Sequence, residues 1–320
     1  MKRAFLPILI LFLISVGSIS ANEPAAVDSA QKAVLITGAS SGLGRSMAKL
    51  LASEGFFVYA GARKDKDMEE LNQIPNMQAV RLDVTKQTDI DSAVKTITEA
   101  GRGLYGLINN AGVVVIAPLI EIHEEDFDFQ MDVNLYGPYR VTRAFAPLIM
   151  ESKGRISTIS SISGILSGPL FGPYSMSKHA MEAFGDSLAR EMERFGVQVS
   201  LIEPGTYNSD IGKNMVKRME RRGQSIEDSM FKEDMQGMLD WLKQFDGSSG
   251  DPQEVAKAAL HAMSSDTPKR RYLVVPNQEQ ANWTIRKAIE ELAQLNQQQS
   301  QSFDRDTLVK MLDEVLEANP

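Results

Sequence analysis

The sequence of 320 residues contains no cysteine, which excludes disulfide bonds, thiolate nucleophiles and cysteine-ligated zinc or iron–sulfur sites. It has only three histidines, and His123, His179 and His261 lack the spacing of metal ligands. We therefore expect no metal site. The chain also lacks a surplus of positive charge, because its net charge is −8. Neither nucleic acid nor an anionic membrane surface is expected as its main partner.

The first 21 residues differ from the rest of the chain. Lys2 and Arg3 precede an apolar run over residues 4–16, and small residues follow this run. The arrangement is typical of a secretory signal peptide, and the run is too short for a comfortable transmembrane span. We interpret residues 1–21 as the export signal of a periplasmic or secreted protein, or alternatively as an uncleaved N-terminal anchor that makes the only membrane contact. The small, polar residues 22–31 are typical of a linker.

Short apolar runs alternate with helical patterns over most of the remaining chain. Strands are predicted at 33–37, 56–60, 77–81, 104–108, 155–159, 198–202 and 272–275. Helices are predicted at 43–54, 89–99, 127–150, 175–194 and 252–263. This alternation implies an α/β fold with a doubly wound parallel sheet of Rossmann type, formed as a single domain by residues 32–277.

Two segments interrupt or follow this alternation. Residues 206–249 are charged and rich in methionine, and we interpret them as an insertion that forms a lid over the substrate site. Residues 278–320 are expected to form a helical C-terminal extension. They contain a glutamine-rich stretch at 294–301 and an amphipathic helix at 307–316.

A turn rich in glycine and serine, TGASSGLG at residues 37–44, follows the first predicted strand. Glycines allow the backbone to bend sharply and to approach a pyrophosphate closely. The N-terminus of the next helix offers free N–H groups and a positive dipole end to this anion. A turn without a ligand could have the same composition, but the strand–turn–helix context favours dinucleotide binding.

This turn resembles the TGxxxGxG fingerprint of the short-chain dehydrogenase/reductase family, and other motifs of that family follow in order over residues 33–275. They are Asp83, the NNAG sequence at 109–112, Asn134, Ser161, Tyr174, Lys178 and the Pro204–Gly205 pair. The resemblance implies a nicotinamide-dependent oxidoreductase. The cofactor site that it implies comprises Thr37, Gly38, Ser40, Ser41, Gly42, Leu43, Gly44, Asp83, Val84, Asn110, Ala111, Gly112, Tyr174, Lys178, Pro204, Gly205 and Thr206.

The residues after the second strand favour NADP(H). NAD-specific dinucleotide folds carry an acidic residue there, but this chain has Arg63 and Lys64, and Arg63 lies 19 residues after Gly44. A guanidinium at that place can pair with a 2′-phosphate. A solvated surface pair is the alternative interpretation. Ser41 occupies the position of the family's second basic residue, which leaves NAD possible as a cofactor.

The predicted catalytic residues are Ser161, Tyr174, Lys178 and Asn134. Tyr174 and Lys178 are four residues apart and share one face of a helix. A nearby ammonium group lowers the pKa of a tyrosine and makes it a competent general acid/base. Such a pair is usually structural when it stands alone, but Ser161 follows a predicted strand and can donate to a substrate oxygen. By resemblance, Asn134 holds a water that connects Lys178 to solvent.

These patterns predict hydride transfer between NADP(H) and an alcohol or ketone on a small substrate. The methionines of the lid favour an apolar substrate, which could be lipid-, steroid- or retinoid-like or aromatic. They could instead pack as ordinary core or form an oligomer contact, and the lid charges Lys217, Arg218, Arg221 and Arg222 could read an acidic substrate. The alternative function is a non-catalytic NADP(H)-binding sensor or scaffold on the same fold. The family resemblance also implies a homodimer or homotetramer.

Overall fold

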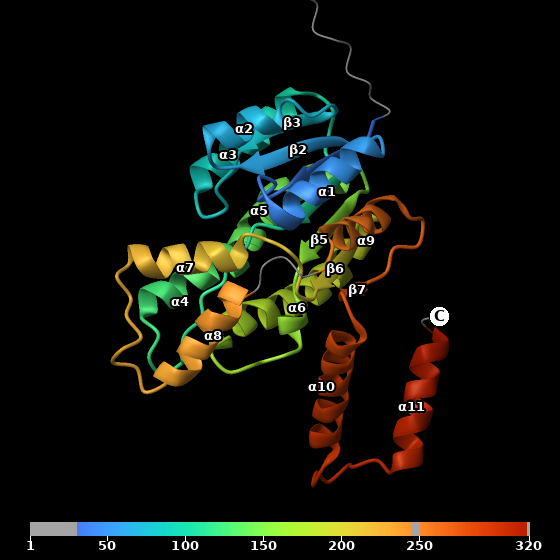
Figure 1. Ribbon diagram of the computed structural model, residues 1–320. Coiled ribbons are helices and arrows are strands. Elements are labelled where there is room, and N and C mark those ends of the chain that lie inside the picture. The colour runs from blue at the N-terminus through green and yellow to red at the C-terminus, as the bar shows by residue number, and fades with distance from the viewer. Residues whose placement is uncertain (1–30, 245–249, 319–320) are drawn as a thin grey trace, which may run out of the picture.

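The computed structural model describes residues 31–244 and 250–318 (Figure 1). The predicted signal peptide or anchor and most of the predicted linker lie outside the described residues. Within them, seven parallel strands form one sheet in the order β3-β2-β1-β4-β5-β6-β7. The strands are β1 (Ala33–Ile36), β2 (Phe57–Ala62), β3 (Met77–Arg81), β4 (Gly106–Asn109), β5 (Arg155–Ile159), β6 (Gln198–Pro204) and β7 (Arg271–Val274).

The first strand shows why the sheet is covered on both faces. All four residues of β1 are buried. Val34 and Ile36 belong to the apolar core on one face, whereas Ala33 and Leu35 belong to the core on the other. Successive side chains of a strand point to opposite faces, so a strand between two helical layers is apolar throughout.

Helices pack on both faces, as the alternation of strands and helices predicts. Helices α1 and α9 share one core with alternate residues of β1, and α3, α5 and α6 share the other. Their bounds are α1 (Gly42–Ser53), α3 (Gln87–Glu99), α5 (Gly137–Glu151), α6 (Gly172–Met192) and α9 (Pro252–Ser264). The strand order reverses between β1 and β4, and ligands of doubly wound folds bind at the carboxyl ends of the strands beside this point.

Two elements differ from the sequence prediction. Helix α2 (Asp65–Leu71) was not predicted. Five of its seven residues are charged and only Leu71 is buried, so it has no apolar periodicity that would mark a helix. The single helix predicted at 127–150 is in fact α4 (Glu124–Met131), a π-helical turn η1 (Asp132–Tyr136) and α5. Turns of this kind occur frequently at functional sites.

The proposed lid contains α7 (Ile211–Arg221) and α8 (Lys232–Gln244), and Figure 1 shows both beside α4. The C-terminal helices α10 (Gln278–Asn296) and α11 (Arg305–Ala318) project from the domain below β7. They confirm the predicted helical extension, in which α10 includes the beginning of the glutamine-rich stretch and α11 covers the predicted amphipathic helix. No helix within residues 31–244 and 250–318 combines the length and apolar content that a membrane crossing requires.

Candidate active site

The turn after β1 is determined by its glycines. Gly38 has a φ of +66°, a backbone conformation that favours glycine. A Cβ atom on Gly44 would lie 2.3 Å from the carbonyl oxygen of Gly38. No larger residue fits at Gly44 without moving this turn. The turn places the backbone of residues 38–44 at the carboxyl end of β1.

The helix that follows this turn offers an anion site. Helix α1 begins at Gly42, and the side chain of its N-cap residue Ser41 makes no capping hydrogen bond. The first turn of α1 contains no acidic residue. The free N–H groups and the positive end of the helix dipole therefore suit a phosphate group, and the residues present fit a dinucleotide pyrophosphate.

The end of β4 is locked to the same turn. Thr37 Oγ1 accepts hydrogen bonds from the backbone N–H groups of Asn110 and Ala111, both at 2.9 Å. The Asn110 side chain donates to the carbonyl oxygens of Thr37 and Gly38 at 2.9 and 3.1 Å. The predicted residues from these two strand ends therefore form one rigid wall beside the switch point.

The residues predicted to select the cofactor lie at the ends of β2 and β3. Arg63 Nη1 is 4.0 Å from Asp83 Oδ2, and the Arg63 side chain is 66% exposed. Burial raises the pKa of Asp83, but hydrogen bonds from Thr85 and the charge of Arg63 outweigh it and lower the pKa overall. Lys64 is the N-cap residue of α2. The structure thus brings the long, exposed side chain of Arg63 and the carboxylate of Asp83 together at one corner of the candidate cofactor site.

Three of the four predicted catalytic residues come together at the ends of β5 and α6. A hydrogen bond links Ser161 to Tyr174, and Ser161 Oγ also accepts from the N–H of Ser163 at 3.1 Å. Lys178 Nζ lies 5.6 Å from the centre of the Tyr174 ring and donates to the carbonyl oxygen of Ile159 at 2.8 Å. The strand end and the first turns of α6 therefore hold the three side chains as one group.

The pKa of Tyr174 in the structure shifts in the opposite direction from the one that the sequence predicts. Burial raises the pKa of Tyr174, and the hydrogen bond from Ser161 offsets part of this rise. Burial also lowers the pKa of Lys178 to about 8, while the charge of Glu182 acts in the opposite direction. From the sequence we expect Lys178 to lower the pKa of Tyr174. In the structure, burial instead raises that pKa. Tyr174 therefore keeps its proton at neutral pH, as a proton donor must.

Asn134, the fourth predicted catalytic residue, lies in the π-helical turn η1. Its Oδ1 accepts from the N–H of Val113 at 2.8 Å, and its Nδ2 donates to the Val113 carbonyl oxygen at 3.0 Å and to Ser177 Oγ at 3.1 Å. The amide thus joins the segment after β4 to α6, one residue before Lys178. The water relay assigned to Asn134 stays a prediction.

Gln130 is a site residue that the sequence analysis missed. It is fully buried, its Oε1 accepts from the N–H of Val115 at 2.7 Å, and its Nε2 donates to the Val113 carbonyl oxygen at 3.0 Å. It precedes Asn134 by four residues and so holds the same segment from the same side of the helix. This spacing is the signal that could have identified it.

An acidic group formed by α6 and β6 around Arg271 was also missed. Arg271 Nε lies 3.2 Å from Glu182 Oε2 and 3.2 Å from Glu203 Oε1, and its Nη2 lies 2.8 Å from Asp186 Oδ2. One arginine therefore faces three carboxyl groups. Burial, followed by the charge of Glu182, raises the pKa of Glu203 to about 8.

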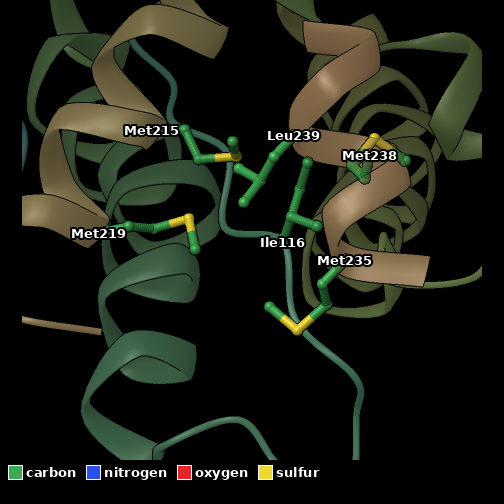
Figure 2. A pocket seen from close by; sticks show the side chains of 6 residues that line it. All are labelled: Ile116, Met215, Met219, Met235, Met238 and Leu239. Carbon is green, nitrogen blue, oxygen red and sulfur yellow. The ribbon is translucent and has the colours of Figure 1, made fainter. Parts of the chain in front are cut away.

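Tyr174 packs against an apolar cluster that contains methionines of the proposed lid. The apolar cluster that includes Met215 and Met235 also contains Leu170, Phe171 and Tyr174. A cavity of about 10 Å³, with room for about one water, lies within it (Figure 2). Its lining residues are Ile116, Met215, Met219, Met235, Met238 and Leu239. A hollow of about 720 Å³ between α4 and the lid shares four of these residues.

Ion pairs hold the lid to α4. Arg218 Nη2 lies 2.7 Å and Arg222 Nε 3.2 Å from Asp126 Oδ1, and Asp126 is buried. Arg222 Nη2 also lies 2.7 Å from Glu125 Oε2. Protein carboxylates therefore already pair with two of the four lid charges, Arg218 and Arg222, whereas Lys217 and Arg221 are exposed.

Comparison with known proteins agrees with this geometry. The family model described as short chain dehydrogenase matches residues 32–220. The chain is 37% identical over 264 residues to the mitochondrial D-beta-hydroxybutyrate dehydrogenase of Bos taurus, covering 75% of this chain and 76% of that protein. It is 34% identical to retinol dehydrogenase 7 of Mus musculus, with 75% and 79% covered, and 34% identical to 17-beta-hydroxysteroid dehydrogenase type 6 of Homo sapiens, with 75% and 80% covered.

Solved structures share the fold. A short-chain dehydrogenase from Streptomyces avermitilis superposes with a TM-score of 0.70 at 25% identity, covering 91% of this chain and 98% of that one. A short chain dehydrogenase/reductase from Burkholderia phymatum in complex with NAD gives a TM-score of 0.71 at 24% identity, covering 86% and 98%. The predicted fold and family are confirmed: the chain belongs to the short-chain dehydrogenase/reductase family of NAD(P)-dependent oxidoreductases acting on CH–OH groups.

Proposed function

We propose that this protein transfers a hydride between NADP(H) and the alcohol or ketone group of a small, largely apolar substrate. One observation carries the substrate class. Tyr174 packs against the apolar cluster that includes the lid methionines Met215 and Met235, and the lid arginines Arg218 and Arg222 are engaged by carboxylates. A substrate that replaces these contacts beside the tyrosine gains most from an apolar surface.

The preference for NADP(H) rests on the corner formed by β2 and β3. The exposed Arg63 can turn from Asp83 towards a 2′-phosphate, and Lys64 follows it. Asp65, the first acidic residue after β2, is paired with Arg81. That pairing leaves the acid poorly placed to accept from the ribose hydroxyls of NAD, so the basic pair dominates this corner.

The chain's own residues have separate tasks in the reaction. The bound cofactor supplies or accepts the hydride. In the reductive direction, Ser161 and Tyr174 donate hydrogen bonds to the substrate oxygen, and the Tyr174 hydroxyl proton passes to that oxygen as negative charge develops on it. Lys178 returns a proton to the tyrosine, and we assign its resupply to water at Asn134. The oxidation of an alcohol follows the same steps in reverse.

The relatives suggest two substrate types, and the structure favours one. The name of one relative includes hydroxybutyrate, a small hydroxy acid, and the names of others include retinol and hydroxysteroid. A hydroxy acid needs a cation near the reacting carbon, but Arg218 and Arg222 are paired with Asp126 and Glu125. An alcohol or ketone on a retinoid- or steroid-like skeleton therefore suits this site better.

The test combines cofactor titration with two substitutions. NADPH should bind more tightly than NADH, and Arg63→Ala should remove most of that difference. Tyr174→Phe should lower kcat by about 10²- to 10⁴-fold, the usual contribution of a general acid, while NADPH binding stays unchanged. Steroid- and retinoid-type substrates should be turned over in preference to 3-hydroxybutyrate. A protein that binds NADPH but turns over none of these substrates would support the sensor alternative, and failure to bind either nucleotide would refute both.

The location and assembly of the protein are separate proposals. We propose that residues 1–21 direct export or anchor the chain, and that the folded domain forms a homodimer or homotetramer. N-terminal sequencing of the mature protein tests the first proposal, and light scattering in solution tests the second.

A further inference from the structure

The C-terminal extension reaches the active-site edge of the sheet through one side chain. Gln280 lies in the first turn of α10 and is only 8% exposed. Its Oε1 accepts a hydrogen bond from the backbone N–H of Thr206 at 2.9 Å. The two residues are 74 positions apart in sequence. A glutamine amide is thus inserted into the turn that follows β6.

This contact shapes the turn itself. A Cβ atom on Gly205 would lie 2.2 Å from Gln280 Oε1, so the glutamine can occupy its place only because residue 205 is glycine. The N–H of Gly205 donates to the carbonyl oxygen of Val274 at 2.8 Å. Two successive N–H groups of the turn are therefore held by elements beyond residue 270, namely β7 and α10.

Gln280 is fixed as firmly as the turn that it holds. The side chain of Asn277, the N-cap residue of α10, accepts from the N–H of Gln280 at 3.0 Å. Thr284 is completely buried, and its Oγ1 donates to the Gln280 carbonyl oxygen at 2.8 Å. The first turns of α10 are thus anchored, whereas Ile285, Ile289 and Leu292 further along the helix are at least half exposed.

The turn after β6 lies beside the catalytic group. Strand β6 is the neighbour of β5, and the N–H of Ser160 donates to the carbonyl oxygen of Ile202 at 2.8 Å. Ser161 comes directly after this end of β5, and Tyr174 in the first turn of α6 interacts with it. A cofactor whose pyrophosphate lies at β1 must extend along this edge to place its nicotinamide near Tyr174.

We propose that Gln280 is a positioning residue that holds the turn at Pro204, Gly205 and Thr206 in the conformation required by the nicotinamide end of the cofactor. This inference rests on the proposed function, because it assumes that the turn contacts the cofactor. The family match ends at residue 220, so Gln280 lies outside it. It follows that the beginning of α10 is part of the enzyme's cofactor site.

The full-length protein carrying Gln280→Met tests this role. Methionine keeps the volume of the side chain but cannot accept from Thr206, which leaves a buried N–H unpaired. We expect the Kd and the KM for NADPH to rise about five- to tenfold, the equivalent of one lost hydrogen bond, while the KM for the second substrate changes little. Gln280→Glu retains the acceptor and should restore most of the binding.

Gln278→Met is the matched control, because Gln278 is exposed in the same helical turn and its side chain donates only to Asn282. Equal NADPH constants for Gln280→Met, Gln278→Met and the unaltered chain would overturn the proposal. Loss of thermal stability in Gln280→Met with no change in the NADPH constants would overturn it too, by showing a merely structural role. If the unaltered chain bound no nucleotide, the proposed function would fail first and this inference with it.

Discussion

The two sides of the active site are built from different materials. On the cofactor side, backbone atoms are in tight contact, as at Gly38 and Gly44, and the strand ends are locked through Thr37. On the substrate side, flexible methionine side chains fill the space, and ion pairs to Asp126 hold the lid. A backbone cradle tolerates almost no change in shape, whereas unbranched, polarizable side chains adapt to different ligands. In the proposed function, the molecule therefore combines a fixed cofactor site with an adaptable substrate site.

NADPH binding should be largely lost when a side chain disrupts the backbone contacts of the glycine turn. In Gly44→Ala, the new Cβ must displace the Gly38 carbonyl, 2.3 Å away, and we expect NADPH affinity to fall by more than about 100-fold, which corresponds to about 3 kcal/mol. Titration with NADPH measures this effect. Gly237→Ala is the control in the lid, because a Cβ there has no atom within 4 Å. It should stabilise α8 by about 0.5–1 kcal/mol and leave NADPH binding intact; equal behaviour of the two variants would contradict the contrast.

The lid should loosen when its ion pairs are broken. In Asp126→Asn, Arg218 loses its buried carboxylate partner, and we expect a loss of stability of about 1–3 kcal/mol. The KM for the substrate should rise more than the KM for NADPH, because the change affects only the substrate side. Asp128→Asn alters an exposed acid on the same helix and should change neither constant. A parallel rise in both KM values after Asp126→Asn would show that the two sides are not independent.

The scaffold shared by both sides contains the buried acid Glu203. Its pKa is about 8 in the folded protein against an ordinary value of 4.5, so the folded state binds a proton that the unfolded chain releases between these pH values. Stability should therefore decrease as the pH rises from about 4.5 to about 8. Glu203→Gln should remove this decrease, so its gain in Tm over the unaltered protein should grow with pH. The exposed Glu193→Gln serves as the control, and a gain in Tm independent of pH would contradict the assignment.

The smallest effect is expected within the methionine cluster itself. Met238→Leu nearly conserves volume and should cost less than about 1.5 kcal/mol. We expect a shift of a few fold in the preference between long, flexible substrates and rigid, ring-shaped ones, with an unchanged Kd for NADPH. Met176→Leu replaces a methionine that is 46% exposed and should leave that preference unaltered. If Met238→Leu weakened NADPH binding, the cluster would belong to the cofactor side.

Much of the fold could be predicted because its signals are local. The strands 77–81 and 155–159 were predicted to the residue, since each is a short segment with apolar or β-branched residues within the strand–helix alternation. The helical C-terminal extension was predicted, but the bounds of α10 within it were not, because most of its surface is exposed and its anchoring residues are polar. The break of the predicted helix at 127–150 into α4, η1 and α5 was also missed, since no periodicity in the sequence marks a π-helical turn.

By itself, the sequence determined the doubly wound sheet, the glycine turn and the spacing that places Tyr174 and Lys178 on one helical face, because each depends on neighbours within a few residues. Only the tertiary structure decided which partners distant residues have. Arg218 meets Asp126 across 92 positions of sequence, and Gln280 meets Thr206 across 74. Such contacts depend on how separate elements pack against each other, and burial then shifts the pKa values of side chains such as Glu203 and Lys178. Neither the packing nor the burial is encoded in a local pattern.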